Sequence, residues 1–157
     1  MISATHLHAM IVHFPIALLF AGFLSEGIAF ISKKEFFKQA AFYLLVLGAL
    51  GAIAAFFSGD YAGEGIEEGP LEGPMELHEQ VATITLWLSI AAASFRVVTT
   101  YFKLIPVWTK WVNTLMFTAL IGAVSYTGYL GGQLVYSHGA GVQLVMPDFN
   151  TSAEDAD

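Results

Sequence analysis

Five histidines are the residues of this sequence best suited to chemistry. They are His6, His8, His13, His78 and His138. Imidazole nitrogens ligate haem iron, zinc and copper, and they exchange protons near neutral pH. The sequence contains no cysteine, which excludes disulfides, iron–sulfur clusters, thiolate zinc sites, cysteine nucleophiles and covalently attached c-type haem. The candidate chemistry is therefore histidine ligation of a metal ion or of a non-covalent haem.

The first three histidines are close together in sequence, and their spacing defines helical faces. If a helix begins before residue 6, then His6, Met10 and His13 share one face at positions i, i+4 and i+7. His8 then points about 140° away from His13, at about 100° per residue. Pro15 follows closely, and we expect it to kink a helix that begins this early.

Four long apolar runs must position these histidines. They cover about residues 10–31, 36–57, 81–98 and 111–130. Each run has the length that a helix needs to cross a hydrocarbon layer of ~30 Å, at ~1.5 Å per residue. Apolar residues make up 56% of the 157-residue chain and charged residues only 12%, about half of the usual ~25%. The sequence predicts an all-α fold, an integral membrane four-helix up-and-down bundle over residues 1–145, followed by a disordered acidic tail over residues 146–157.

The charges predict an orientation for this bundle. All six basic residues lie in the first and third connections, namely Lys33, Lys34, Lys38, Arg96, Lys103 and Lys110. By the positive-inside rule these connections are cytoplasmic, so both termini are outside. Eleven of the 13 acidic residues lie on the opposite side with all five histidines. We therefore expect a multi-pass protein of the bacterial inner membrane whose periplasmic side is acidic, and this charge also disfavours nucleic-acid binding.

Bundle geometry suggests how the histidines meet. The first and third spans of an up-and-down bundle lie on a diagonal and run in the same direction. We therefore expect His13 and His78 to face each other as axial ligands of haem b, with His8 and His138 as a second pair or as partners of the haem propionates. Alternatively, two or three of these imidazoles bind copper or zinc together with Asp60 or Glu79. Met10, Glu79 and Tyr136 are secondary candidates.

Other polar and small residues leave alternatives open. Glu26 lies within the first span, where it pairs with Arg96, relays protons or reaches the interface. The second span carries the small-residue pairs Gly48/Ala52 and Gly51/Ala55, which either let helices pack closely or leave room for a flat cofactor. The glycines and prolines between residues 58 and 80 predict about 20 residues of irregular backbone, typical of a lid or a mobile segment.

Two stretches resemble a family of small four-helix bacterial membrane proteins of unknown function. HLHAMIVHFPIALLF at residues 6–20 is similar to that family's opening pattern, HPxxVHFPIAL. GGQLVYSHGAGV at residues 131–142 is similar to its closing pattern, GGxLVYxHGxGV. GDYAG at 59–63 and HE at 78–79 occur in the same order between them. One departure is Ala9, where the family pattern has proline.

The resemblance implies a set of site residues. The positions that match the family patterns are His8, His13, Asp60, His78, Gly132, Tyr136 and His138. Relatives of this kind are sometimes attached to Rieske-type or other redox modules, so the resemblance implies an electron-transfer setting with a redox partner or a quinone.

The sequence is compatible with three functions. The first is a haem b protein that transfers electrons at the external face, and the second is a membrane protein that binds or senses copper or zinc. The third is a structural or assembly subunit without a cofactor, whose histidines are hydrogen-bonded at helix ends. No hydrolase or phosphate-binding motif is present, so we expect a redox or binding subunit, with homo-oligomerisation possible, more than a stand-alone enzyme. The acidic side attracts metal cations and lacks basic partners for haem propionates.

Overall fold

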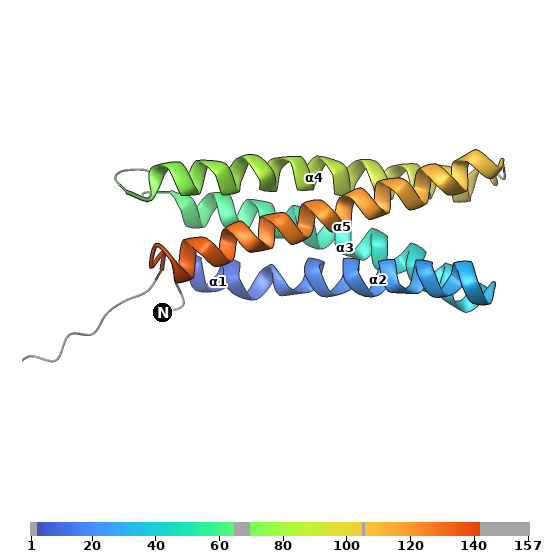
Figure 1. Cartoon of the computed structure of the whole chain (residues 1–157), viewed down its shortest axis with the longest axis horizontal. Helices are drawn as coiled ribbons and strands as arrows, with labels where there is room; N and C mark the ends of the chain where they lie inside the picture. Colours follow the sequence, from blue (N-terminus) through green and yellow to red (C-terminus); the bar gives the residue numbers. More distant parts are fainter. Residues whose placement is uncertain (1–2, 65–69, 105, 142–157) are drawn as a thin grey trace, which may run out of the picture.

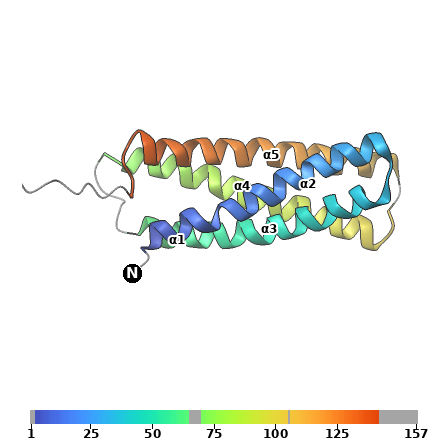
Figure 2. The same cartoon turned by 90° about the horizontal axis from the view of Figure 1, so that it is seen from below.

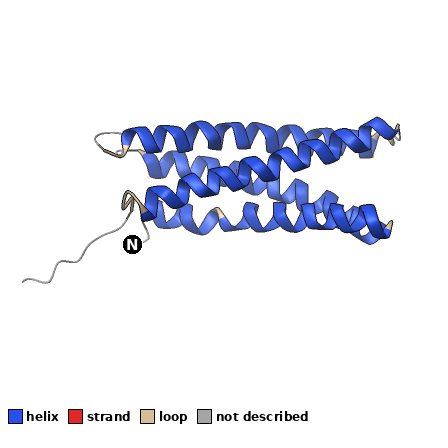
Figure 3. Ribbon diagram, viewed as in Figure 1, coloured by secondary structure: helices blue, strands red, loops and turns tan. Residues whose placement is uncertain are grey.

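The chain folds into long helices that run side by side. The computed structural model describes residues 3–64, 70–104 and 106–141. The helices are α1 (Ala4–Ile11), α2 (His13–Ser32), α3 (Glu35–Gly63), α4 (Glu72–Tyr101) and α5 (Val107–Tyr136). Within these residues all regular secondary structure is helical, as Figure 3 shows. The all-α prediction is therefore confirmed.

The helices form a four-helix up-and-down bundle, because α1 and α2 together make the first crossing (Figures 1 and 2). Packing runs around the bundle from α2 to α3, to α4, to α5 and back to α2. Over the described residues, α2 and α4 make no direct backbone contact, so they lie on a diagonal. This is the arrangement that the sequence predicts for the first and third spans.

Each crossing is long enough and apolar enough to span a membrane. The four candidate spans are Ala4–Ser32, Glu35–Gly63, Glu72–Tyr101 and Val107–Tyr136. Each contains one predicted apolar run and extends beyond it at both ends. A helix of 29 residues is about 43 Å long at ~1.5 Å per residue, which matches a bilayer including its headgroup layers. The helix ends therefore lie among headgroups and water, and the chain belongs in a lipid bilayer.

The connection between the second and third spans is shorter than the sequence predicts. We expected irregular backbone from residue 58 to residue 80, but α3 continues to Gly63 and α4 already begins at Glu72. Pro74 does not interrupt α4, because it lies in the first turn, where a backbone N–H has no helical partner to lose. The segment 65–69 and the predicted tail 146–157 lie outside the described residues.

The first crossing begins early and is interrupted once, as the sequence predicts. Ser3 caps α1, and its side chain accepts a hydrogen bond from the backbone N–H of His6. The helix is broken at Val12, between α1 and α2 (Figure 3). Pro15 explains the break, because it has no N–H to donate to the carbonyl of Ile11, four residues earlier.

Small residues of α3 let α2 approach closely. A Cβ atom on Gly48 would lie 2.6 Å from Leu19 Cδ2, and one on Gly51 would lie 3.3 Å from Pro15 Cβ. Leu19 is fully buried and joins Phe117 and other apolar side chains in the core. At these two positions the space is occupied by side chains of α2, so the glycines serve helix packing.

This contact predicts the effect of one added methyl group. We expect Gly48→Ala to lower the free energy of unfolding by about 1–3 kcal/mol, because Leu19 is enclosed and cannot move aside. The measurement is thermal unfolding of the purified protein in detergent. Gly122→Ala is the matched control, since a Cβ there meets nothing within 4 Å and alanine favours a helix by about 1 kcal/mol. Equal stability of the two variants would contradict this account of the interface.

Candidate functional site

Four segments that are distant in sequence meet at one end of the bundle. They are α1, the end of α3, the beginning of α4 and the end of α5 (Figures 1 and 2). This is the end that carries the histidines. The connections between α2 and α3 and between α4 and α5 lie at the opposite end, together with all six basic residues. The up-and-down topology therefore separates basic from acidic residues along the bundle.

His8 of α1 is half-buried against the end of α3. Its Nδ1 lies 2.9 Å from Ser58 Oγ. A Cβ on Gly59 would lie 2.9 Å from the His8 ring, so the ring occupies the space that a larger side chain would fill. The sequence Ser58–Gly59 thus supplies both a polar partner and room for the imidazole.

The hydrogen bonds around Ser58 define which nitrogen of His8 carries the hydrogen. The Ser58 hydroxyl donates to the carbonyl of Ala55, at 2.9 Å. Because it has a single hydrogen, its oxygen accepts from His8, so Nδ1 is the protonated nitrogen. The lone pair of neutral His8 is then on Nε2. Histidines that bind metals are oriented in this way, by a hydrogen bond from the nitrogen that does not bind.

His78 of α4 is the second inward-facing imidazole. A Cβ on Gly131 of α5 would lie 3.2 Å from its Cε1 atom, so this ring also packs against a glycine. Among the described residues, its Nδ1 is a buried side-chain nitrogen without a hydrogen-bond partner. Buried polar atoms almost always have a partner in the folded protein, in ordered water or in a bound ligand. The Thr127 backbone carbonyl of α5 also interacts with this ring, and no hydrogen bond of good geometry reaches Nδ1. Nδ1 of His78 is therefore the candidate ligand atom of this group.

His8 and His78 lie close enough to each other to interact electrostatically. Their helices reach this end from different sides of the bundle, and each ring is admitted by a glycine of a neighbouring helix. A third glycine, Gly63, packs against the Glu79 carboxylate, which lies 3.2 Å from the position of a Cβ. Ser58, Gly59 and Gly131 were not among the predicted site residues, although the Gly-Asp and Gly-Gly pairs in the sequence pointed to two of these positions.

The structure does not bring His13 into this group. The His13 side chain is exposed, and its Nδ1 donates to the carbonyl of Ala9 at 2.6 Å. The expected facing of His13 and His78 is therefore replaced by the pair His8 and His78. The other predicted site residues also lie on the surface, namely Met10, Asp60, Glu79, Tyr136 and His138. Within the described ranges, no three histidine, aspartate or glutamate side chains are grouped as a metal site.

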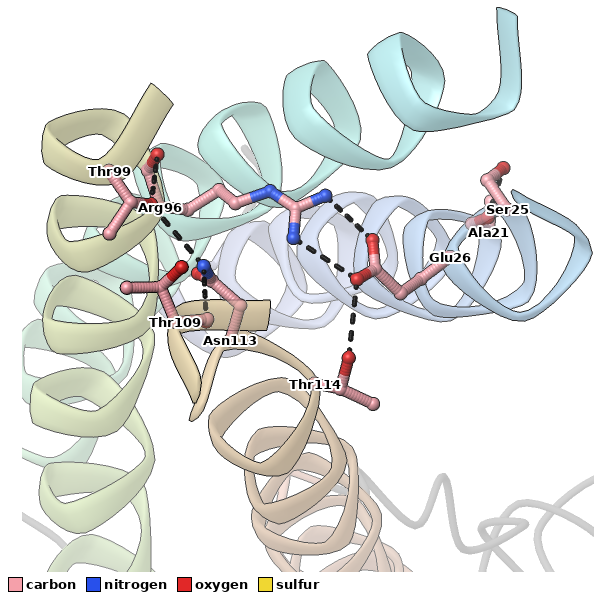
Figure 4. Close-up of polar contacts among 8 residues, drawn as sticks. All are labelled: Ala21, Ser25, Glu26, Arg96, Thr99, Thr109, Asn113 and Thr114. Carbon is pink, nitrogen blue, oxygen red and sulfur yellow. Dashed lines mark hydrogen bonds and ion pairs between the residues drawn. The ribbon is translucent and has the colours of Figure 1, made fainter. Parts of the chain in front are cut away.

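A second polar centre lies inside the bundle toward the basic end (Figure 4). Arg96 of α4 donates two hydrogen bonds to the carboxylate of Glu26 of α2, at 3.1 and 2.7 Å. The two side chains are only 16% and 15% exposed. Thr114 of α5 donates to the same carboxylate at 3.4 Å. Of the three alternatives left open for Glu26, the structure shows the pairing with Arg96.

This ion pair joins the diagonal helices. Since α2 and α4 make no direct backbone contact over the described residues, Glu26 and Arg96 reach across the interior to connect them. Below Arg96, the Asn113 amide donates to Thr99 Oγ1 at 3.3 Å and thus links α5 to α4 (Figure 4). Such paired charges are the form in which ionisable groups are tolerated inside a membrane.

Comparison with known proteins identifies the family of this chain and names no activity, ligand or cofactor. A family model described as "Predicted membrane protein (DUF2231)" matches residues 4–144. The chain belongs to this family. No curated protein and no solved structure matches the chain. The family match confirms the resemblance seen in the opening and closing patterns of the sequence, and it agrees with the four membrane-length helices.

The ion pair predicts a large loss of stability when one partner is removed. We expect Glu26→Ala to cost about 3–5 kcal/mol, because it leaves Arg96 charged in the interior without a partner. The matched control is Glu35→Ala, whose pair with Lys38 is 68% and 51% exposed and contributes about 0–1 kcal/mol. Both variants are compared by thermal unfolding in detergent.

A double substitution tests whether the loss of stability comes from the charge that is left without a partner. Glu26→Met with Arg96→Met should recover most of the stability, since apolar side chains of similar volume replace buried ion pairs at little cost. If Glu26→Ala is no more destabilising than Glu35→Ala, then the pair does not hold α2 and α4 together.

Proposed function

We propose that this protein binds a transition-metal ion, foremost copper, between His8 and His78 at the acidic end of its membrane bundle. The observation that carries the proposal is the buried Nδ1 of His78, which no hydrogen bond of good geometry reaches, within electrostatic range of a second imidazole with a defined tautomer. Imidazole is a preferred ligand of copper, zinc, iron and nickel. Metal binding would give the buried nitrogen the partner that it lacks.

The number of ligands favours copper over zinc. Zinc sites in proteins are almost always four-coordinate, with three or four protein ligands. Cu(I) accepts two nitrogen donors, so an imidazole pair is sufficient for it without a third side chain. The Ser58 hydroxyl supports such a site, because it orients His8 with Nε2 free to bind. The acidic residues at this end, such as Asp60 and Glu79, raise the local concentration of cations.

Haem b with an electron-transfer role is the second candidate, and the same imidazole pair favours it, since bis-histidine ligation requires two such rings. Two observations weigh against it. The rings of His8 and His78 are packed against Gly59 and Gly131, and all six basic residues that could bind propionates belong to the opposite end. A haem-containing protein would pass electrons to a redox partner or a quinone at the membrane surface.

The proposal includes an orientation. The basic end is proposed to be cytoplasmic, following the positive-inside rule, and the acidic end with the imidazole pair to face the periplasm of a bacterial inner membrane. Copper would then bind from the periplasmic side.

Metal binding can be tested directly with the purified full-length protein. We expect the protein in detergent to bind Cu(I) in competition with a chromophoric chelator. His8→Ala or His78→Ala should weaken this binding by at least about 10–100-fold, and Ser58→Ala by about 10–100-fold, because loss of an orienting partner alone has an effect of that size. His138→Ala is the control, since it removes an exposed histidine at the same end of the bundle.

The absorption spectrum of the same sample discriminates among the three functions. A colourless protein whose bound copper is lost in His8→Ala or His78→Ala supports the proposal. A Soret band with sharp reduced α and β bands that disappear in His8→Ala or His78→Ala would overturn it in favour of haem. A protein that binds neither haem nor metal would leave a structural or assembly role.

Orientation is tested with topology reporters. A periplasm-active phosphatase fused after the last residue should be active, and the same enzyme inserted between α2 and α3 should be inactive. The reverse pattern would place the imidazole pair on the cytoplasmic side and overturn the proposed route of metal entry.

A further inference from the structure

The end of the bundle opposite the histidines carries positive charge that its own acidic residues do not balance (Figure 1). Of the acidic residues, only Glu26 and Glu35 lie in this half of the bundle, and each is paired with one basic residue. Four exposed lysines have no carboxylate partner over the described residues, namely Lys33, Lys34, Lys103 and Lys110. Basic residues at the ends of membrane-spanning helices attract anions of the membrane surface.

Two of these lysines follow α2 at the place where it meets α5. Lys33 and Lys34 come directly after the last residue of α2. In the last turn of that helix, the ring centroid of Phe30 lies 6.1 Å from that of Trp111, near the beginning of α5. The end of α2 and the beginning of α5 are therefore side by side, and the two lysines lie next to an exposed tryptophan.

Lys110 reaches the same place from α5. It directly precedes Trp111 in the sequence and lies one helical turn before Thr114. Thr114 donates to the carboxylate of Glu26 of α2 at 3.4 Å, so this side of α5 faces α2. Lys110 therefore lies on the side of α5 where α2 ends, and three ammonium groups without a carboxylate partner gather there.

An apolar groove on α2 leads from the middle of the bundle to these lysines. Its volume is about 630 Å³, and it is lined by side chains of α2 between Phe20 and Ile31. Phe23, one of the lining residues, packs edge to face against Phe117 of α5 at 5.5 Å, so the groove runs beside α5. From Phe20 to Ile31 the helix rises about 16 Å, which is about half of a hydrocarbon layer of ~30 Å. The groove thus has the length of a lipid acyl chain in one leaflet.

Gly27 leaves this groove open. A Cβ atom there would meet no other atom within 4 Å, so the protein's own packing does not require a glycine, in contrast to Gly48 and Gly51. Leu24 and Ile31 flank it along the groove and are 65% and 84% exposed. A glycine between large exposed side chains leaves a hollow on the lipid-facing side of the helix.

We propose that this end of the bundle binds one anionic phospholipid. Its phosphate lies among Lys33, Lys34 and Lys110, and one of its acyl chains lies in the groove on α2. Basic pockets between membrane helices bind anionic headgroups, and tryptophan is a residue that lies at the headgroup level. Since the groove belongs to a membrane span, its occupant comes from the bilayer. The site is at the opposite end from His8 and His78, so it does not depend on the proposed metal binding.

The headgroup contacts are tested by native mass spectrometry of the full-length protein in detergent. The probe lipids are dioleoylphosphatidylglycerol and dioleoylphosphatidylcholine, which have the same acyl chains and differ in net charge. We expect one equivalent of the anionic lipid to be retained in preference to the zwitterionic one. Lys110→Gln should weaken its binding by about 5-fold, and removal of Lys33, Lys34 and Lys110 together by about 100-fold. Lys103→Gln is the matched control, because it removes the same charge beyond α4, which is diagonal to α2. An equal effect of Lys103→Gln and Lys110→Gln would contradict the proposed site.

The groove is tested with all lysines in place. Gly27→Leu puts a side chain into the hollow without meeting another part of the protein, and we expect it to weaken binding of the anionic lipid by at least about 10-fold. Gly122→Leu is the matched control, since this glycine of α5 is equally open. If Gly27→Leu binds the anionic lipid as tightly as the unmodified protein does, the lysines only attract headgroups in general and the proposed site is wrong.

Other occupants give different results. Thermal unfolding in detergent should shift to a higher temperature with dioleoylphosphatidylglycerol, whereas the same concentration of inorganic phosphate should have no effect, because it has no acyl chain for the groove. An equal shift with phosphate would indicate a site for a free anion and overturn the proposal. A lipid-free dimer that Gly27→Leu dissociates would also overturn it, since the groove would then be an interface between two copies of the chain.

Discussion

The pairing of Glu26 with Arg96 is the interaction on which this bundle depends. Neither charge is tolerated alone within a hydrocarbon layer, so each helix that carries one must present it to the other. The two helices concerned, α2 and α4, are diagonal neighbours without direct backbone contact over the described residues. The bidentate bond therefore fixes how both helices are rotated about their axes. That rotation decides which other side chains of α2 and α4 face the interior.

The rotation of the first crossing links the ion pair to the imidazole pair. Glu26 follows His8 by 18 residues, which is five helical turns at about 100° per residue, so both lie on the same helical face. The buried residues Pro15 and Leu19 lie on this face between them and pack against Gly51 and Gly48. A helix turned inward by Glu26 at one end thus turns His8 inward at the other. The small break at Val12 does not disturb this relation.

The four crossings could be predicted from the sequence, whereas the inward-facing histidines could be predicted only in part. Apolar length identified the four crossings, and the positions of the basic residues placed the histidines at one end. The choice between His8 and His13 depended on the face of the helix, and Glu26 held that information, because a charged residue within a span must face the interior. The interior contacts of His78 could not be predicted from the sequence, because they depend on Gly131 of a different helix. The lengths of α3 and α4 were underestimated because their ends are polar and amphipathic in composition, so hydropathy alone does not mark them.

The first crossing therefore sorts its histidines by face. His6, Met10 and His13 are about 140–200° from His8 around the helix, and all three are exposed, whereas His8 contacts Ser58 in the interior. The inner imidazoles of His8 and His78 are enclosed by glycine contacts from α3 and α5, whereas the rest of the bundle leaves the outer side chains uncovered. Glu26, five turns away along the same face, thus determines which histidine of the first crossing faces the interior.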